Sequence, residues 1–98
     1  MAKLYLAAGH SVTGIGRNHS LQHPLFSFIP LDLEDLNAVK AVQFDCSLSE
    51  AILINNAGQI GAIQRISEQE ESDIERVMTI NSTAPMLLCQ QFLQQLMV

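Results

Sequence analysis

The sequence has few basic residues and few cysteines, and both shortages limit what the protein can be. Among 98 residues, five are Lys or Arg and ten are Asp or Glu, so the formal net charge is -5. A nucleic-acid surface needs a basic patch, and the sequence holds no cluster of basic residues. Cys46 and Cys89 stand far apart, in no metal-binding or redox spacing, which fits a reducing cytoplasm. We expect a cytoplasmic protein with no nucleic-acid partner.

Long apolar runs and metal-binding clusters are also missing. No apolar stretch reaches the roughly 20 residues of a membrane-spanning helix, so we expect no membrane association. The N-terminal apolar stretch is too short for a signal peptide, and we predict a helix over residues 2–8 that Gly9 caps. His19 and His23 have a helical ligand spacing, but Pro24 disfavours a helix at His23, so we predict no metal site.

Residues 1–98 make one domain at most, and apolar residues make up 48% of them. Predicted strands alternate with predicted helices, which indicates an α/β fold with a parallel sheet. Two candidate capping boxes, Ser67 with Glu70 and Ser72 with Glu75, mark the start of the last helical region. We expect helices over residues 2–8 and 32–42, strands over 10–16, 25–31 and 51–54, and helix through the C-terminal third.

Small polar residues follow the predicted strand at 51–54. A strand of apolar residues alone is typical of a parallel sheet that helices cover on both faces. This one ends in Asn55, Asn56, Ala57 and Gly58. In open parallel sheets, ligands bind beyond the carboxyl ends of strands, where such residues let a ligand approach the backbone. The alternative is a loop that requires Gly58 at positive φ.

Four motifs, in this order along the chain, resemble the short-chain dehydrogenase/reductase family. They are GRN (Gly16–Asn18), LDL (Leu31–Leu33), NNAG (Asn55–Gly58) and INSTAPMLLCQQFL, which contains Asn81. The resemblance covers nearly the whole chain. It implies a partial Rossmann-type parallel sheet with flanking helices, an NAD(H) or NADP(H) cofactor, and hydride transfer at the carbonyl or alcohol carbon of a small-molecule substrate.

The resemblance also assigns cofactor-binding roles at the ends of the predicted strands. Asp32 would contact the adenine, helped by the backbone of Leu33. Asn56, Ala57 and Gly58 would run beside the cofactor's ribose.

Two further roles fall on the C-terminal helical region. By the same resemblance, Ile80 would approach the cofactor through its backbone, and Asn81 would be the catalytic asparagine that holds a water in the proton relay. Pro85, four residues later, has no amide to give the Asn81 carbonyl, and its ring pushes that carbonyl aside. This supports the assignment of Asn81. The alternative is that Pro85 kinks a packing helix or starts a new one.

Arg17 and Asn18 follow the first predicted strand and bear on the choice of cofactor. Family members that prefer NAD usually carry an acidic residue at the end of this strand, where the chain has Gly16. The position therefore holds no carboxylate that would repel a 2′-phosphate. The Arg17 guanidinium can bind a 2′-phosphate through two hydrogen bonds. We therefore favour NADP(H) over NAD(H). The alternative is that Arg17 is a solvated loop residue.

Parts of the family pattern are not found within the 98 residues. TGIG (Thr13–Gly16) resembles the family's phosphate-binding turn, but it opens no helix, so we assign its glycines to the strand predicted at 10–16, the family's second, and to its exit. The family's catalytic Tyr and Lys stand four residues apart, whereas the single tyrosine here, Tyr5, is followed by Gly9 at that offset. We expect the middle portion of a dehydrogenase, which lacks the family's first strand and its C-terminal half and is inactive as this chain alone.

A non-catalytic interaction module is the alternative function. The chain could pair with an intact homologue, or with itself, through its long C-terminal helix or its exposed strands. Apolar residues on that helix could supply the contact, or they could cover the chain's own sheet; they are Leu88, Phe92, Leu96 and Met97.

Overall fold

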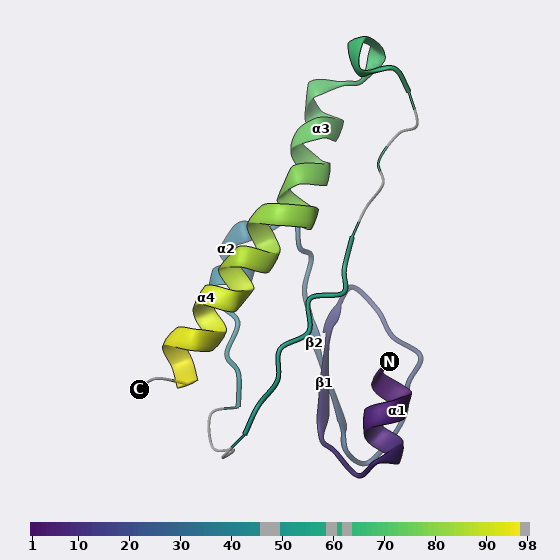
Figure 1. Ribbon diagram of the computed structural model, residues 1–98, viewed down its shortest axis with the longest axis vertical. Coiled ribbons are helices and arrows are strands. Elements are labelled where there is room, and N and C mark those ends of the chain that lie inside the picture. Colours follow the sequence, from purple (N-terminus) through teal and green to yellow (C-terminus); the bar gives the residue numbers. More distant parts are fainter. Residues whose placement is uncertain (46–49, 59–60, 62–63, 97–98) are drawn as a thin grey trace. The chain divides into compact units, whose positions relative to one another are not determined.

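The computed structural model describes residues 1–45, 50–58, 61 and 64–96. The chain divides into two compact units, Met1–Asp32 and Leu33–Val98. The elements follow one another in the order α1, β1, β2, α2, η1, α3, η2, α4, and Figure 1 labels the α-helices and the strands. A parallel sheet with helices before and after it confirms the predicted α/β class.

The first unit begins with helix α1 (Ala2–Ala7), which ends one residue earlier than predicted. Gly9 follows with a φ of 86°. Its amide donates to the Leu6 carbonyl at 3.0 Å, and the His10 amide donates to the Tyr5 carbonyl at 3.0 Å. These two bonds form a Schellman cap, which favours a residue without a Cβ at the left-handed position. The predicted role of Gly9 is confirmed.

Two parallel strands follow, β1 (Val12–Gly16) and β2 (Phe26–Pro30). They pair in a register that places Gly16 opposite Pro30, and the Leu31 amide continues the ladder by donating to the Gly16 carbonyl at 2.8 Å. The glycines of the TGIG motif lie inside β1, as predicted. The two strands therefore bring their carboxyl ends to the same edge of the sheet.

The connection between the strands, residues 17–25, contains no helix. This agrees with its short length in the sequence. The His19 ring instead packs on two side chains of β2, with centroid distances of 4.4 Å to Phe28 and 5.2 Å to Phe26. Phe26 and Phe28 are two residues apart and so share one face of the strand. The loop covers this face with an aromatic ring.

The second unit opens with α2 (Leu36–Lys40), which is shorter than the predicted helix over 32–42. Asp35 is its N-cap and accepts a hydrogen bond from the Ala38 amide at 3.1 Å. At the other end, the Ala41 amide donates to the Ala38 carbonyl at 3.1 Å, the tighter bond of a closing turn. The cap fixes the start of the helix, so the acidic residues before it lie outside.

Helix fills most of the remaining described part of this unit, and Figure 1 shows α3, η2 and α4 as one run. Neither predicted capping box begins it: the residue before α3 is Glu70, whose side chain makes no capping bond. The Glu70 carbonyl accepts the amides of Asp73 and Ile74, both at 3.1 Å, and acidic side chains in the first turn suit the helix dipole. The elements are the 3-10 helix η1 (Ile66–Glu68), α3 (Glu71–Met78), the π-helical turn η2 (Thr79–Thr83) and α4 (Ala84–Leu96).

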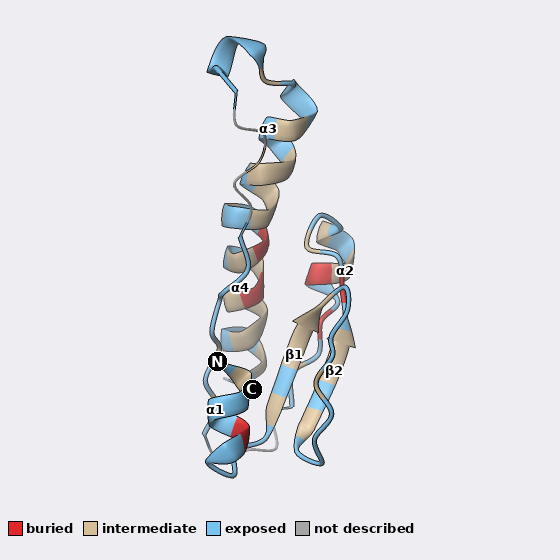
Figure 2. Cartoon of the chain, turned by 90° about the vertical axis from the view of Figure 1, so that its right-hand side faces the viewer, coloured by how far each residue is buried: buried red, intermediate tan, exposed pale blue. Residues whose placement is uncertain are grey.

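The core of the second unit lies where α2 and α4 pack together. Val39 of α2 is fully buried, and Val42 just after it is 4% exposed. From α4, Ala84 is fully buried and Leu88 is 6% exposed. Figure 2 shows buried residues on both helices. Small and branched apolar side chains therefore hold this unit together.

A side-chain clamp adds to this packing. Gln95 of α4 accepts a hydrogen bond from the Phe44 amide at 2.7 Å and donates one to the Val42 carbonyl at 2.8 Å. The rings of Phe44 and Phe92 meet edge to face, with centroids 5.3 Å apart. The clamp satisfies backbone groups of the segment that leaves α2, and it fixes that segment on α4.

The predicted strand at 51–54 is wrong. Residues 50–58 have no regular secondary structure, and in the described part of the chain the only paired strands are β1 and β2. Ile52 is 67% exposed. A strand requires a ladder of hydrogen bonds to a neighbour, and an apolar sequence alone does not supply one. None of the helices in the described residues is both long enough and apolar enough to cross a bilayer.

Candidate functional site

In the first unit, three of the predicted cofactor-binding residues lie at the carboxyl edge of the sheet. Arg17 and Asn18 come directly after β1, and Asp32 follows β2 by two residues. The parallel register and the bond between the Leu31 amide and the Gly16 carbonyl place both exits at one edge. Arg17, Asn18 and Asp32 are all exposed. The structure therefore brings together an arginine, an amide and a carboxylate where open parallel sheets bind ligands.

In the second unit, the NNAG segment lies along the helical run. The Asn55 Nδ2 atom donates to the Sγ atom of Cys89 in α4 at 3.1 Å. A Cβ built on Gly58 would stand 3.6 Å from Oδ1 of Asn81. One built on Gly61 would stand 2.7 Å from Cγ2 of Val77 in α3. Asn55, Gly58 and Gly61 thus meet α4, η2 and α3 in turn, in the reverse of the chain order of these helices, and the approach at Gly61 leaves no room for a Cβ.

Gly58 and Asn81 are the two predicted site residues that this arrangement brings face to face. Gly58 is not among the glycines with positive φ, which are Gly9 and Gly61. The loop that would require Gly58 at positive φ is therefore excluded. A Cβ at this position would meet Asn81 Oδ1 at an ordinary van der Waals distance, so Gly58 lies next to the Asn81 carboxamide. Asn56, Ala57 and Gly58 are all exposed and accessible to a ligand.

Asn81 is the central residue of the π-helical turn η2. The Ala84 amide donates to the Thr79 carbonyl, five residues earlier, so the turn holds one residue more than an α-helical turn. Ala84 keeps helical angles, with φ -62° and ψ -46°, so no new helix starts at Pro85. The run widens at Asn81 and continues. Single π-turns of this kind are frequent at functional sites, and this one also carries Ile80.

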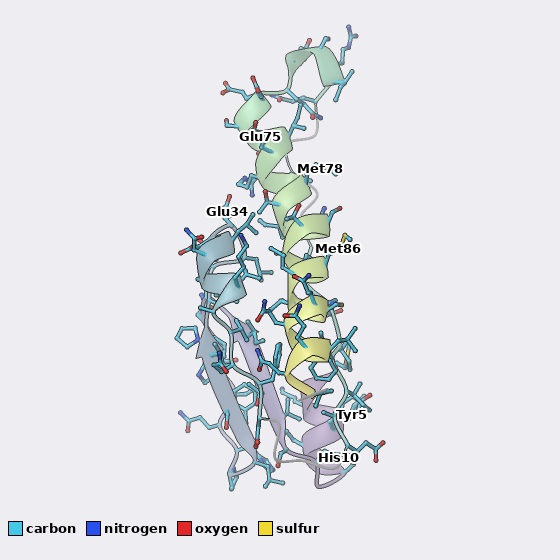
Figure 3. The ribbon with its side chains drawn as sticks, turned by 90° about the vertical axis from the view of Figure 1, so that its left-hand side faces the viewer. Tyr5, His10, Glu34, Glu75, Met78 and Met86 are labelled. Carbon is cyan, nitrogen blue, oxygen red and sulfur yellow. The ribbon has the colours of Figure 1, made fainter. Side chains whose placement is uncertain are left out.

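A polar depression of about 530 Å³ lies elsewhere in the second unit, and no sequence motif predicts it. Arg76 donates to the Asp73 carboxylate at 2.6 Å, and its Nε atom stands 3.8 Å from the Glu34 carboxylate. Glu34, labelled in Figure 3, precedes α2. The hydrogen bond to Asp73 raises the pKa of the Arg76 guanidinium. The depression is lined by Glu34, Gln64, Glu70, Ser72, Asp73 and Arg76. Among the described residues, no group of three or more His, Cys, Asp or Glu could hold a metal ion.

Comparison with known proteins identifies the family. The model of the short chain dehydrogenase family matches residues 1–98, so the chain belongs to this family of oxidoreductases. The benzil reductase ((S)-benzoin forming) of Bacillus subtilis (strain 168) is 32% identical over 96 residues. The match covers 89% of this chain and 39% of that protein, so the chain spans about two fifths of its relative's length. No solved structure matches the chain.

Membership of this family implies a nicotinamide cofactor, and the residues present fit parts of one. The exposed Asn56–Gly58 segment offers amide groups with little side-chain bulk, which suits ribose hydroxyls. Arg17 offers a planar set of donors, which suits a phosphate. Leu33, the remaining predicted contact, is half-buried at the start of the second unit.

Proposed function

We propose that these 98 residues form the cofactor-side portion of an NADP(H)-dependent oxidoreductase that acts on the carbonyl or alcohol group of a small molecule. The observation that carries the proposal is that Gly58 lies next to Asn81. A Cβ built on Gly58 would stand 3.6 Å from the Oδ1 atom of Asn81. It joins the exposed NNAG segment to the π-turn. A ligand along Asn56–Gly58 would lie next to the carboxamide that the family resemblance makes catalytic.

The roles proposed for the second unit are those that the family resemblance implies. Asn56, Ala57 and Gly58 bind the ribose, and Ile80 approaches the cofactor through its backbone. Asn81 orients a water that passes protons to and from the reacting oxygen, so it serves turnover more than affinity. The bound cofactor supplies the hydride.

The roles in the first unit concern the adenosine end of the cofactor. The Arg17 guanidinium donates two hydrogen bonds to the 2′-phosphate, which only NADP(H) carries. Asn18 lies next to it as a further donor, and Asp32 contacts the adenine with help from the Leu33 backbone. The exposed positions of Arg17 and Asp32 at one sheet edge support this assignment.

We expect no turnover from these 98 residues alone. Reduction of a carbonyl needs a proton donor at the substrate oxygen as well as a hydride. The family's donor is a tyrosine with a lysine four residues later, and Tyr5 has Gly9 at that offset. Tyr5 also lies in α1, which precedes both strands and every predicted site residue along the chain.

The relative's name describes reduction of a diketone to a hydroxyketone, so a carbonyl compound of that kind is the first substrate to test.

A chimera tests the cofactor and its specificity. The segment of the Bacillus subtilis benzil reductase that aligns with this chain is replaced by residues 1–98, and benzil reduction is followed with NADPH and NADH. We expect Arg17→Ala to raise the KM for NADPH about tenfold, because a charged hydrogen-bonded contact is lost, and to leave the KM for NADH within twofold. Lys40→Ala, an exposed basic residue at the end of α2, is the charge control. Equal weakening of both cofactors by Arg17→Ala would contradict the 2′-phosphate role.

The interaction module remains a second candidate, because α4 exposes large apolar side chains. Met86 is 72% exposed and Leu93 is 56% exposed, and Figure 3 shows Met86 on the helix side away from α2. Leu88 and Phe92 are occupied by the unit's own packing, and Met97 lies outside the described residues. Sedimentation of the chain with and without Leu93→Glu tests for a homo-oligomer through this helix.

A further inference from the structure

We propose that Cys89 is a positioning residue for the cofactor-binding segment, because its sulfur holds the Asn55 side chain and thereby fixes the backbone of Asn56–Gly58. Neither residue is among the predicted site residues. The proposal rests on the proposed function, since it gives that same segment its anchor.

The contact joins parts of the chain that are far apart in sequence. Asn55 Nδ2 donates to Cys89 Sγ at 3.1 Å across a separation of 34 residues. Asn55 is exposed and belongs to a segment without regular secondary structure. Cys89 is a half-buried free thiol in the middle of α4, whose backbone is fixed by helical hydrogen bonds. A segment without regular secondary structure is thus held to a helix.

The position of the tie gives it its effect. The segment also meets the helical run at Gly58, opposite Asn81, and at Gly61, opposite Val77. At both of these positions the segment contributes a glycine, which has no side chain that could form a hydrogen bond to the helix. The Asn55 side chain therefore provides the directional bond on the N-terminal side of Asn56–Gly58. Without it, these three residues keep van der Waals contact at Gly58 but lose a fixed orientation of their amide groups.

A sulfur acceptor sets the expected size of the effect. Thiol sulfur accepts hydrogen bonds weakly, and a neutral hydrogen bond changes an equilibrium about two- to tenfold, so we expect the lower end of that range. Serine at position 89 keeps an acceptor, and alanine removes it while preserving helix propensity. Comparing the two variants separates the hydrogen bond from the packing of the side chain.

The first experiment uses the 98-residue chain and needs no cofactor. Backbone order parameters of residues 55–58 are measured by 15N relaxation in the native chain, in Cys89→Ser and in Cys89→Ala. We expect values near the rigid limit of about 0.85 in the native chain and Cys89→Ser, and a fall toward about 0.6 in Cys89→Ala. Leu93→Ala, at an exposed position of the same helix, should leave them unchanged. Unchanged values in Cys89→Ala, or a fall in Cys89→Ser equal to that in Cys89→Ala, would overturn the proposal.

The second experiment uses the benzil reductase chimera and separates this proposal from the proposed function. Cys89→Ala should raise the KM for NADPH about two- to threefold with kcat nearly unchanged, and Cys89→Ser should restore it. An unchanged KM in Cys89→Ala would overturn the positioning role. A chimera with native Cys89 that fails to bind NADPH would instead reject the proposed function, and the order parameters would still decide whether Cys89 holds Asn55.

Discussion

Gln95 allows a quantitative test of what holds α4 in the second unit. Gln95→Ala removes the bond from the Phe44 amide, at 2.7 Å, and the bond to the Val42 carbonyl, at 2.8 Å. Each neutral hydrogen bond contributes about 0.5–1.5 kcal/mol net, so the free energy of unfolding should fall by about 1–3 kcal/mol. Both bonds are partly buried, and water can replace some of what is lost. The change is a large share of a typical domain stability of about 5–15 kcal/mol.

Urea unfolding of the chain, followed by circular dichroism, measures this change as a lower midpoint at constant m. Gln94→Ala, at an exposed position one residue earlier, is the matched control.

Gln95→Glu tests the geometry of the clamp. Its carboxylate cannot donate to the Val42 carbonyl, so the pKa of the new carboxyl should lie above its unfolded value of about 4.3. A raised folded pKa gives stability that is present below the unfolded pKa and lost as the pH rises. Gln95→Glu should therefore match the native chain near pH 4 and be less stable at pH 7. Native stability of Gln95→Ala would refute the clamp.

Three further predictions concern other positions. Gly61→Ala should lower the free energy of unfolding by about 1–3 kcal/mol, because its Cβ would stand 2.7 Å from Val77 Cγ2 at a φ of 78°; Gly61→Ala with Val77→Ala should recover part of the loss in urea unfolding. Asp35→Ala should cost about 1 kcal/mol through loss of the cap on the Ala38 amide, seen as a lower Tm. In the chimera, Asn81→Ala should lower kcat and leave the Kd for NADPH within about twofold, and an unchanged kcat would contradict its relay role.

Local signals in the sequence predicted local structure well. Gly9 ends α1 because a cap depends on a few neighbouring backbone groups, all within six residues. β1 and β2 form where their apolar pattern predicts, and the short spacing between them leaves no room for a helix. The family resemblance is confirmed over residues 1–98, and it named Gly58 and Asn81, which the structure brings together.

Contacts between distant segments could not be predicted in this way. The strand expected at 51–54 has the right residues but no ladder, because pairing depends on a neighbour and not on the segment itself. The hydrogen bond between Asn55 and Cys89 joins residues 34 positions apart, and neither residue type predicts such a contact. The capping boxes failed because Glu70 precedes α3, although serines stand nearby with suitable spacing. The choice between NADP(H) and NAD(H) stays a prediction that rests on Arg17.

The π-turn at Thr79–Thr83 determines where this helical run can lose a residue. The turn holds one residue more than an α-helical turn for about the same rotation, so it absorbs that residue without turning α4 about its axis. Loss of one residue within the turn would restore α-helical winding and leave α4 close to its present rotation. Loss of one residue between the turn and Leu88 would instead rotate the rest of α4 by about 100°, the advance of one α-helical residue. Leu88 would then leave the core that α2 and α4 share, and Cys89 would leave Asn55. Among relatives, single-residue deletions should therefore fall within the turn and be rare in the first turn of α4.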